Sequence, residues 1–595
     1  MRPTAPLLLA LLVFLAVGCA SNPTATATTA DEPRPNVILI ITDDQGYGDI
    51  AAHGNPILQT PHTDALHAES VRLTNFHVDP TCSPTRAALM TGRYAMRTGV
   101  WHTIQGRSML DPDEVTLAEV LRDAGYATGM FGKWHLGDAY PCRPEDQGFT
   151  TVLTHGGGGL GNLPDYWGND YFDDHYRSNT TGWQQYPGYC TDVWFEQATQ
   201  WIGGQKESDQ PFFCYLSTNA PHAPYLAPES YVQPYRDAGL PEQHAKFYGM
   251  ITCIDDNLGR LMAYLDQQGL AENTIVIYMT DNGTSAGWME QESWPQYNAG
   301  MTGFKGSAYE GGHRVPCFIR WPGGGIGGSA DRAKEIETIT AHIDLMPTIL
   351  ELCWQPENPE LAALMDGQSL VPMIRESQGA RSANDDWVYF VQSQRIERPA
   401  KWRTCCVMTD NYRLVNGAEL YDLRNDPGQN EDLAARHPGR VAVMRGAYEH
   451  WWEDLTADLP DVAYILGDDA ANPTTLTTHD LHHDEPGHDG APWHQVHAER
   501  NRPGEGFFLV DIAQPGRYRF TLRRFPPEHG GATGAASATV SIAGQTATAD
   551  ADPEANAAVV ELDLEPADHA QLRARLTQPD GTDRPAFFIE VERVD

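Results

Sequence analysis

The sequence predicts an α/β fold in which a central, mostly parallel sheet is sandwiched by helices. Short apolar runs, typical of strands buried on both faces, occur at residues 37–41, 127–131, 212–216 and 275–279. Between them lie stretches with the apolar spacing of helices, at 116–124, where Gly125 ends the pattern, and at 244–267. Because strands that alternate with helices build parallel sheets, we assign this domain to residues 36–375.

A smaller α+β subdomain is expected over residues 385–465. Its short runs predict antiparallel strands at 387–393, 401–408, 412–414 and 420–423. A helix that carries Val441, Met444, Trp451 and Trp452 would cover this sheet.

The last part of the chain is predicted to be an all-β module. Residues 466–505 are rich in Thr, His, Asp and Gly, which favours a solvated linker, although their histidines could also bind a second metal: His479, His482, His483, His488, His494 and His497. Residues 506–595 then show short strands split by Gly, Pro and Asp turns, at 507–512, 516–523, 538–542, 558–562 and 587–591. This β-sandwich-like module could grip carbohydrate or pack on the catalytic domain, and packing is favoured.

The N-terminus predicts an exported protein. Residues 1–19 combine Arg2 with an apolar run at 7–15 that is too short to span a bilayer, as in a signal peptide. The segment that ends at Cys19 resembles a bacterial lipobox, which implies a lipid anchor on Cys19 and a periplasmic or outer-membrane, cell-surface lipoprotein. The alternative is cleavage near Ala20 and a soluble product. Residues 20–35 would be a flexible tether.

The charge balance excludes nucleic acid as a partner. The chain has 41 Lys and Arg residues against 80 Asp and Glu residues, a formal net charge of -39. Such a field repels polyanions, so any anion must be recognised by a local basic pocket.

The cysteines allow one predicted disulfide. Cys142 and Cys190 bracket a loop-rich insertion and are the preferred pair in an exported protein. Four others lie in apolar contexts and are predicted to be free core thiols: Cys214, Cys253, Cys317 and Cys353. Cys405 and Cys406 are neighbours that could not bridge each other without strain.

Polar clusters follow each buried strand of the predicted sheet, and they contain Asp43 with Asp44, Lys133 with His135, His222, and Asp281 with Asn282. Because ligands bind at the carboxyl ends of such strands, these side chains should share one crevice. Asp43, Asp44, Asp281 and Asn282 offer only hard oxygen ligands, which suit Ca²⁺. Alone, the first pair could cap a helix and the second could form a turn. Two acidic strand ends in one crevice would repel unless a cation joined them, which favours the metal.

A second motif runs from Cys82 to Arg86. Pro84 fits the first turn of a helix that continues to about Met90, with Gly92 past its end. Residue 82 would then lie at the positive end of the helix dipole, and Arg86 could reach back over it. By itself the motif favours a Pro-initiated helix with an ordinary buried thiol.

Together with Lys305 and the segment 310–316, these motifs resemble the sulfatase family over roughly residues 35–455. The resemblance implies the alkaline-phosphatase-like fold and a maturation enzyme that oxidises Cys82 to formylglycine (3-oxoalanine). It implies one Ca²⁺ held by residue 82 and the four oxygen ligands named above. It also assigns sulfate binding to Arg86, Lys133 and Lys305, contact with the formylglycine to His135, and protonation of the departing alcohol to His222. One hydroxyl of the hydrated aldehyde would attack sulfur and the other would later expel sulfate.

Other residues near these motifs have weaker assignments. His102 is a candidate for the pocket lining, and Glu310 with Arg314 is predicted to form a structural ion pair. The glycine run at 155–162 lacks the ending of a phosphate loop and is expected to be a flexible rim. Aromatic and acidic residues follow it, and they suit either sugar binding or a structured insertion: Asp165, Tyr166, Trp167, Asp170, Tyr171, Asp174, His175 and Trp183.

The sequence therefore predicts a Ca²⁺- and formylglycine-dependent hydrolase of sulfate esters, with a sulfated carbohydrate as substrate. Two alternatives stay open. One is a hydrolase of phosphomonoesters, phosphodiesters or phosphonates from the same superfamily. The other is a catalytically silent, carbohydrate-binding lipoprotein, which would bind sugar without turnover.

Overall fold

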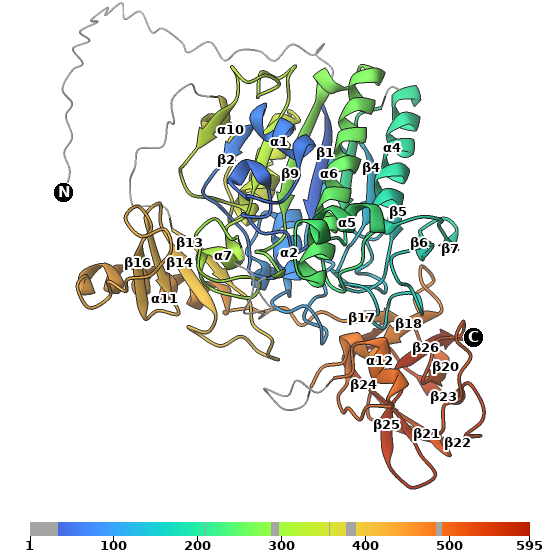
Figure 1. The fold of residues 1–595 in the computed structure, drawn as a ribbon. Helices are drawn as coiled ribbons and strands as arrows, with labels where there is room; N and C mark the ends of the chain where they lie inside the picture. Colours follow the sequence, from blue (N-terminus) through green and yellow to red (C-terminus); the bar gives the residue numbers. More distant parts are fainter. Residues whose placement is uncertain are drawn as a thin grey trace, which may run out of the picture. The chain divides into compact units, whose positions relative to one another are not determined.

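A ten-stranded sheet lies at the centre of the fold, with the strand order β11-β2-β10-β9-β1-β8-β4-β5-β6-β7 (Figure 1). The predicted strands form its middle as β9 (Thr274–Thr280), β1 (Asn36–Thr42), β8 (Phe212–Ser217) and β4 (Ala127–Gly132), all parallel to their neighbours in this group. The computed structural model describes residues 34–208, 210–286, 297–355, 358–375, 388–483 and 491–594. The predicted signal peptide and almost all of the tether lie outside them.

The outer strands of this sheet are shorter. They are β2 (Val71–Leu73), β5 (Thr151–Thr154), β6 (His175–Ser178), β7 (Gly182–Gln185), β10 (Cys317–Arg320) and β11 (Lys334–Ile336). β10 runs antiparallel to β9, and β6 and β7 continue the other edge as antiparallel strands, so the sheet is mixed. A separate pair joins β3 (Phe76–His77) to β12 (Thr340–Ala341).

Strand β1 is apolar throughout because both faces of the sheet are covered. Val37, Leu39 and Ile41 belong to one buried core, whereas Ile38 and Ile40 belong to another. The first core includes residues of α2 (Cys82–Thr91), α3 (Leu117–Asp123) and α8 (Leu345–Leu352), and the second includes residues of α4 (Cys190–Ser208), α5 (Glu229–Asp237) and α6 (Glu242–Gln268). The α/β sandwich that the sequence predicted is confirmed.

The remaining helices are short apart from α11. They are α1 (Pro61–Ala68), α7 (Glu310–His313), α9 (Pro359–Leu364), α10 (Val371–Arg375), α11 (Pro438–Leu455) and α12 (Gln495–Glu499). In the part of the chain that the structure describes, no helix has both the length and the apolar character needed to cross a membrane.

The second predicted sheet forms as four antiparallel strands. They are β13 (Tyr389–Gln392), β14 (Cys405–Met408), β15 (Tyr412–Val415) and β16 (Glu419–Asp422). Val441, Met444 and Trp451 of α11 pack against this sheet in one core with Val407 and Leu414.

Two more antiparallel-rich sheets share a single core in the C-terminal part of the chain. One contains β17 (Tyr464–Leu466), β19 (Phe508–Ile512), β24 (Ala567–Thr577), β21 (Ser537–Ile542) and β22 (Gln545–Asp550), with β25 (Asp583–Pro585) on β24. The other contains β18 (Thr474–Thr477), β26 (Phe588–Arg593), β20 (Gly516–Arg523) and β23 (Ala558–Leu564). The sequence missed β22 and β24, because their many polar side chains hide a strand pattern.

The prediction that residues 466–505 form a solvated linker is wrong for much of this segment. β18 pairs with β26, and His479 and His482 are each 1% exposed. Each buried ring lies beside a carboxylate: Asp480 at 2.9 Å from His479 and Glu397 at 3.3 Å from His482. From composition alone, these histidines were expected to be exposed to solvent. A polar side chain can nevertheless be buried when it is hydrogen-bonded. His488 lies outside the described residues.

The predicted Cys142–Cys190 disulfide is also wrong. Both cysteines are free thiols, and they belong to different cores, Cys142 with the C-terminal sheets and Cys190 with α4 and α6. Bracketing an insertion in sequence does not bring two side chains together. The free core thiols predicted at Cys214, Cys253, Cys317 and Cys353 are confirmed.

We predict that Cys142 and Cys190 are alkylated by iodoacetamide when the chain is unfolded in urea without reductant. Mass spectrometry of the two peptides is the measurement, and Cys214 is the internal control. Dithiothreitol should leave the Tm unchanged, whereas loss of a native disulfide typically costs about 2–5 kcal/mol. Alkylation of Cys214 alone would contradict the assignment.

Candidate active site

The polar clusters that follow β1, β4 and β9 meet at one edge of the sheet, as expected for parallel strands. Asp43, Lys133 and Asp281 are fully buried there. Asp44 and His135 adopt left-handed backbone conformations, with φ of 70° and 60°. Such conformations are uncommon for residues other than glycine and concentrate at functional sites.

Cys82 lies at the start of α2, close to the acidic ends of the first and fourth predicted strands. It is 2% exposed, and its Sγ lies with carboxylate oxygens of Asp43 and Asp281 in a group whose atoms are all within 4.8 Å of one another. Gly92 ends α2 at φ 67°, as the sequence predicted. Residue 82 is thus at the positive end of a helix dipole.

His135 faces residue 82 through one ring nitrogen. Its Nδ1 is 3.4 Å from Cys82 Sγ, and its Nε2 is 2.8 Å from the carbonyl oxygen of Thr103. Because a carbonyl can only accept, Nε2 carries the proton and Nδ1 turns a lone pair toward residue 82. Burial, together with the nearby Lys133 and His479, lowers the pKa of His135 well below its usual range, so the ring is neutral.

Each buried carboxylate of the site contacts its own cation. Arg86 donates from Nη2 and Nε to Asp281 Oδ2, at 2.7 and 3.1 Å. Lys133 Nζ lies 2.7 Å from Asp43 Oδ2, and Lys305 Nζ lies 2.5 Å from Asp44 Oδ1. Arg86 also donates hydrogen bonds to Ser217 Oγ and to the carbonyl oxygen of Lys133.

The two neighbouring aspartates nevertheless differ in their affinity for protons. Burial raises the pKa of Asp43 well above its usual range, since the pull of Lys133 is countered by Asp281 and Asp44. Burial acts on Asp44 too, but Lys305 and His222 hold the pKa of Asp44 below its usual range. Lys133 alone therefore does not offset the cost of burying Asp43, and a further cation bound beside Asp43 would stabilise its charged form.

The residues present fit a hard divalent cation such as Ca²⁺. Asp43 Oδ1 and Asn282 Oδ1 are buried oxygens without a hydrogen-bond partner. The Asn282 amide donates to Asp44 Oδ1 and to the Gly283 carbonyl, both at 2.9 Å, which fixes the direction of its oxygen. Buried acceptors without partners are costly, and oxygen donors of this kind are what Ca²⁺ prefers.

His222 faces the carboxylate oxygen of Asp44 that Lys305 does not contact. Its Nε2 is 3.7 Å from Asp44 Oδ2, and its Nδ1 donates to the Ala223 carbonyl at 2.6 Å. Burial and the positive charge of Lys305 lower the pKa of His222 to about 3. The ring is neutral near pH 7, with its Nε2 lone pair facing the site.

The glycine run at 155–162 is a packed wall, so the prediction of a flexible rim is wrong. A Cβ added at Gly158 would lie 2.1 Å from His135 Cε1, and one at Gly159 would lie 3.1 Å from His222 Cε1. Residues 155–159 are buried. Glycine is needed here because the backbone touches both catalytic histidine candidates.

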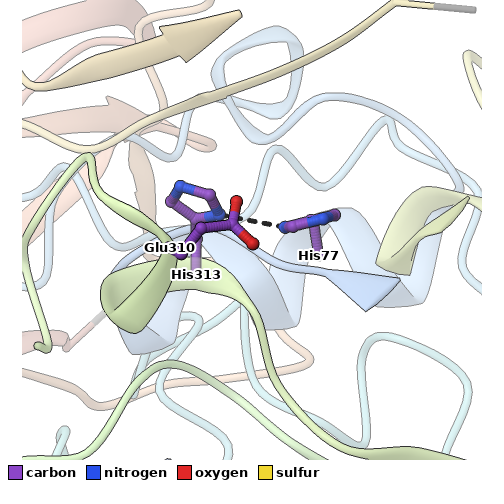
Figure 2. A group of neighbouring side chains, drawn as sticks. All are labelled: His77, Glu310 and His313. Atoms are coloured by element: carbon purple, nitrogen blue, oxygen red, sulfur yellow. Dashed lines mark hydrogen bonds between the residues drawn. The ribbon is translucent and has the colours of Figure 1, made fainter. Parts of the chain in front are cut away.

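Figure 2 shows a second buried group, formed by His77, Glu310 and His313. The Nδ1 atoms of the two histidines are 3.0 Å apart. The predicted Glu310–Arg314 ion pair is present at 3.7 Å. Arg413 of β15 lies closer, 2.5 Å from Glu310 Oε1 and 3.1 Å from His77 Nε2. The Arg413 guanidinium neutralises this carboxylate, and its contacts join β15 of the second sheet to α7 and β3.

Other predicted residues have mainly structural contacts. His102 accepts backbone N–H groups of Thr103 and Ile104, which orients the loop that contacts His135. Asp165 and Asp174 accept backbone N–H groups within the insertion, and Tyr171 is fully buried. The insertion is thus structured, and only part of it, including Tyr166 and Trp183, lines a cavity.

Sequence reasoning missed Ser217 and Arg413, and it assigned His479 to a linker or a second metal site rather than to the surroundings of His135. Ser217 ends β8 and contacts Arg86. The ring centroid of His479 is 6.2 Å from that of His135. No local motif marks these residues, and Arg413 and His479 come from segments far along the chain.

The chain has clear similarity to known proteins. The sequence model of the sulfatase family matches residues 35–353, and that of N-sulphoglucosamine sulphohydrolase, C-terminal, matches residues 304–444. Arylsulfatase J of Mus musculus is 32% identical over 461 residues, which cover 73% of this chain and 73% of that protein. N-acetylgalactosamine-6-sulfatase of Canis lupus familiaris is 28% identical over 383 residues, covering 61% and 69% respectively.

The fold is also shared with solved structures. The crystal structure of Ps i-CgsB in complex with k-i-k-neocarrahexaose matches with a TM-score of 0.62 at 24% identity. The match covers 71% of this chain and 94% of that chain.

Proposed function

Because the chain belongs to the sulfatase family and is a sulfuric ester hydrolase, we propose that it hydrolyses sulfated carbohydrates with a formylglycine at residue 82 and a bound Ca²⁺. The observation that carries the proposal is the position of Cys82. Its Sγ lies among buried carboxylates and cations at a helix N-terminus, where an unmodified thiol would be a poor partner for a hard cation.

Asp43, Asp44, Asp281 and Asn282 would hold Ca²⁺ together with residue 82. The cation would neutralise charge on the sulfate, and the hydrated aldehyde would supply the nucleophilic hydroxyl. Arg86, Lys133 and Lys305 surround the same space and would bind sulfate oxygens. These preorganised cations lower the cost of the charge that develops on the transferred group.

His135 and His222 are proposed to move protons. The Nδ1 lone pair of His135 faces residue 82 and can accept a proton from it. His222 Nε2 faces the side of Asp44 on which the leaving alcohol would lie. Burial and Lys305 keep His222 neutral in the free protein, so it must gain its proton after the anionic substrate offsets Lys305.

Carbohydrate is the proposed leaving group. One relative is named N-acetylgalactosamine-6-sulfatase, a name that specifies a sulfated sugar. In this chain, Tyr166 and Trp183 line a cavity close to the site, and aromatic faces of this kind suit sugar rings. A phosphoesterase of the same superfamily is the competing assignment.

The direct test is turnover by the Cys82→Ala variant, made alongside a formylglycine-generating enzyme. Wild type should release nitrophenol from 4-nitrophenyl sulfate faster than from the phosphate monoester or diester, and Cys82→Ala should lose this activity. Cys317→Ala, which removes another buried thiol, is the matched control and should keep it. Full sulfatase activity without Cys82, or a preference for phosphate, would overturn the proposal.

Calcium should stabilise the folded protein. At a concentration one hundred times its Kd, Ca²⁺ should add about 2.7 kcal/mol to the free energy of unfolding, and EGTA should remove this gain. Asp281→Asn should blunt the response, because it weakens one ligand. Asp255→Asn is the control, since Asp255 is buried but contacts the backbone of α1. An equal response in both variants would contradict the assigned ligands. Urea unfolding curves are the measurement.

The His222→Gln variant should separate good from poor leaving groups. A positioned general acid contributes about 10²–10⁴-fold, so kcat for a sugar sulfate should fall by this order. 4-Nitrophenyl sulfate should be affected far less, because nitrophenolate leaves without protonation. Equal losses on both substrates would argue against the general-acid role.

A further inference from the structure

A cavity of about 340 Å³ lies between the catalytic domain and the C-terminal sheets. Tyr166 and Trp183 line it from the insertion, whereas Arg523, Glu528 and Glu590 line it from the C-terminal module. This size is near the lower end of the range of about 300–1,000 Å³ that is typical of ligand pockets. The sequence had left the role of this module open.

The cavity lies next to the catalytic histidine candidates. Trp134 and Asp138, which flank His135 in sequence, both line it. Gly156 lines the cavity as well. In the same run, Gly158 lies against the ring of His135 and Gly159 lies against the ring of His222. Three residues of extended chain span at most about 11 Å. The wall of the cavity therefore lies within about 11 Å of the backbone beside His222.

A second connection comes from the C-terminal part of the chain. Asp480 lines the cavity, and the adjacent His479 places its ring centroid 6.2 Å from that of His135. Tyr464, another lining residue, donates to Asp480 Oδ2 at 2.9 Å. The C-terminal segment thus forms both a wall of the cavity and part of the surroundings of His135.

The charges of the lining disfavour a second sulfate. Three arginines face five carboxyl residues: Asp138, Asp165, Asp480, Glu528 and Glu590. Two of the arginines are already occupied outside the lining, since Arg143 binds Asp146 at 2.8 Å and Arg177 binds Glu145 at 2.6 Å. Asp138, Asp165 and Asp480 already accept N–H or O–H groups of the protein. The two glutamates of the module add acceptor oxygens and negative charge, which suit the hydroxyl groups of an uncharged sugar and disfavour an anion.

The remaining lining groups suit a sugar ring. Trp183 is 37% exposed on β7, and its ring lies 5.6 Å from that of Tyr166, which is itself stacked on His175 at 4.0 Å. Arg523 lines the cavity from the module side, and its Nη1 donates to the Asn556 carbonyl at 3.3 Å. An aromatic face and carboxylate acceptors are groups that bind an uncharged pyranose.

We propose that this cavity binds an uncharged sugar unit that is covalently linked to the sulfated unit in the active site. The C-terminal module then supplies one wall of a substrate subsite. The proposal rests on the carbohydrate assignment made above, and it adds that the neighbouring unit carries no sulfate.

The test uses the full-length, matured protein with two variants in the same insertion. Trp183→Ala removes the aromatic face of the cavity. Phe172→Ala is the matched control, because Phe172 is 39% exposed but does not line the cavity. The substrates are 4-nitrophenyl sulfate and the oligosaccharide that loses sulfate fastest in a panel of sulfated di- and trisaccharides. The panel includes pairs that differ only by a sulfate on the neighbouring unit.

For the oligosaccharide, Trp183→Ala should raise KM about tenfold or more, with kcat nearly unchanged, and Phe172→Ala should match wild type. All three proteins should hydrolyse 4-nitrophenyl sulfate equally. Arg523→Met, on the module side, should raise KM for the oligosaccharide in the same way. Wild type should also prefer panel members whose neighbouring unit is uncharged.

Three results would each overturn the subsite. They are an unchanged KM for the oligosaccharide in both Trp183→Ala and Arg523→Met, an equal loss of activity on 4-nitrophenyl sulfate, and a preference of wild type for a sulfated neighbouring unit. Failure of the proposed function looks different. In that case wild type would not hydrolyse 4-nitrophenyl sulfate, or would hydrolyse it but no sugar of the panel, and the subsite would fall with the carbohydrate assignment.

Discussion

The site is organised by the balance of charge around a fully enclosed residue 82. Asp43, Asp44 and Asp281 are buried together, a costly arrangement that persists only because Arg86, Lys133 and Lys305 lie within hydrogen-bonding distance. Asp43 Oδ1 and Asn282 Oδ1 are buried without a hydrogen-bond partner, and the proposed Ca²⁺ would supply one to both. The same cations that stabilise the carboxylates are available to an incoming sulfate.

Much of the site could be predicted from the sequence because its residues follow strands directly. Asp43, Lys133 and Asp281 come directly after β1, β4 and β9, whose apolar runs clearly predict buried strands. Parallel strands bring their ends to one edge of the sheet. Cys82 was predictable from Pro84 and Gly92, which mark the start and end of α2. In these cases a local signal and the sheet geometry determine the position together.

The residues that sequence reasoning missed or misassigned are held by contacts without a local signature. Arg413 donates to Glu310, which is 103 residues away in the sequence. His479 comes from the C-terminal segment and lies beside His135. Composition was misleading in two places. A glycine run indicated flexibility, but it is the only backbone that fits against two histidine rings, and a His- and Asp-rich segment indicated a hydrated linker although its rings are buried against carboxylates.

The central claim is that the thiol of Cys82 becomes an aldehyde inside this charged enclosure. The most direct measurement is the mass of the peptide that contains residue 82, from protein produced with a formylglycine-generating enzyme and treated with an aldehyde-reactive hydrazide. We expect the mass of 3-oxoalanine and its hydrazone in the active protein. An unmodified cysteine at residue 82 in fully active protein would contradict the account.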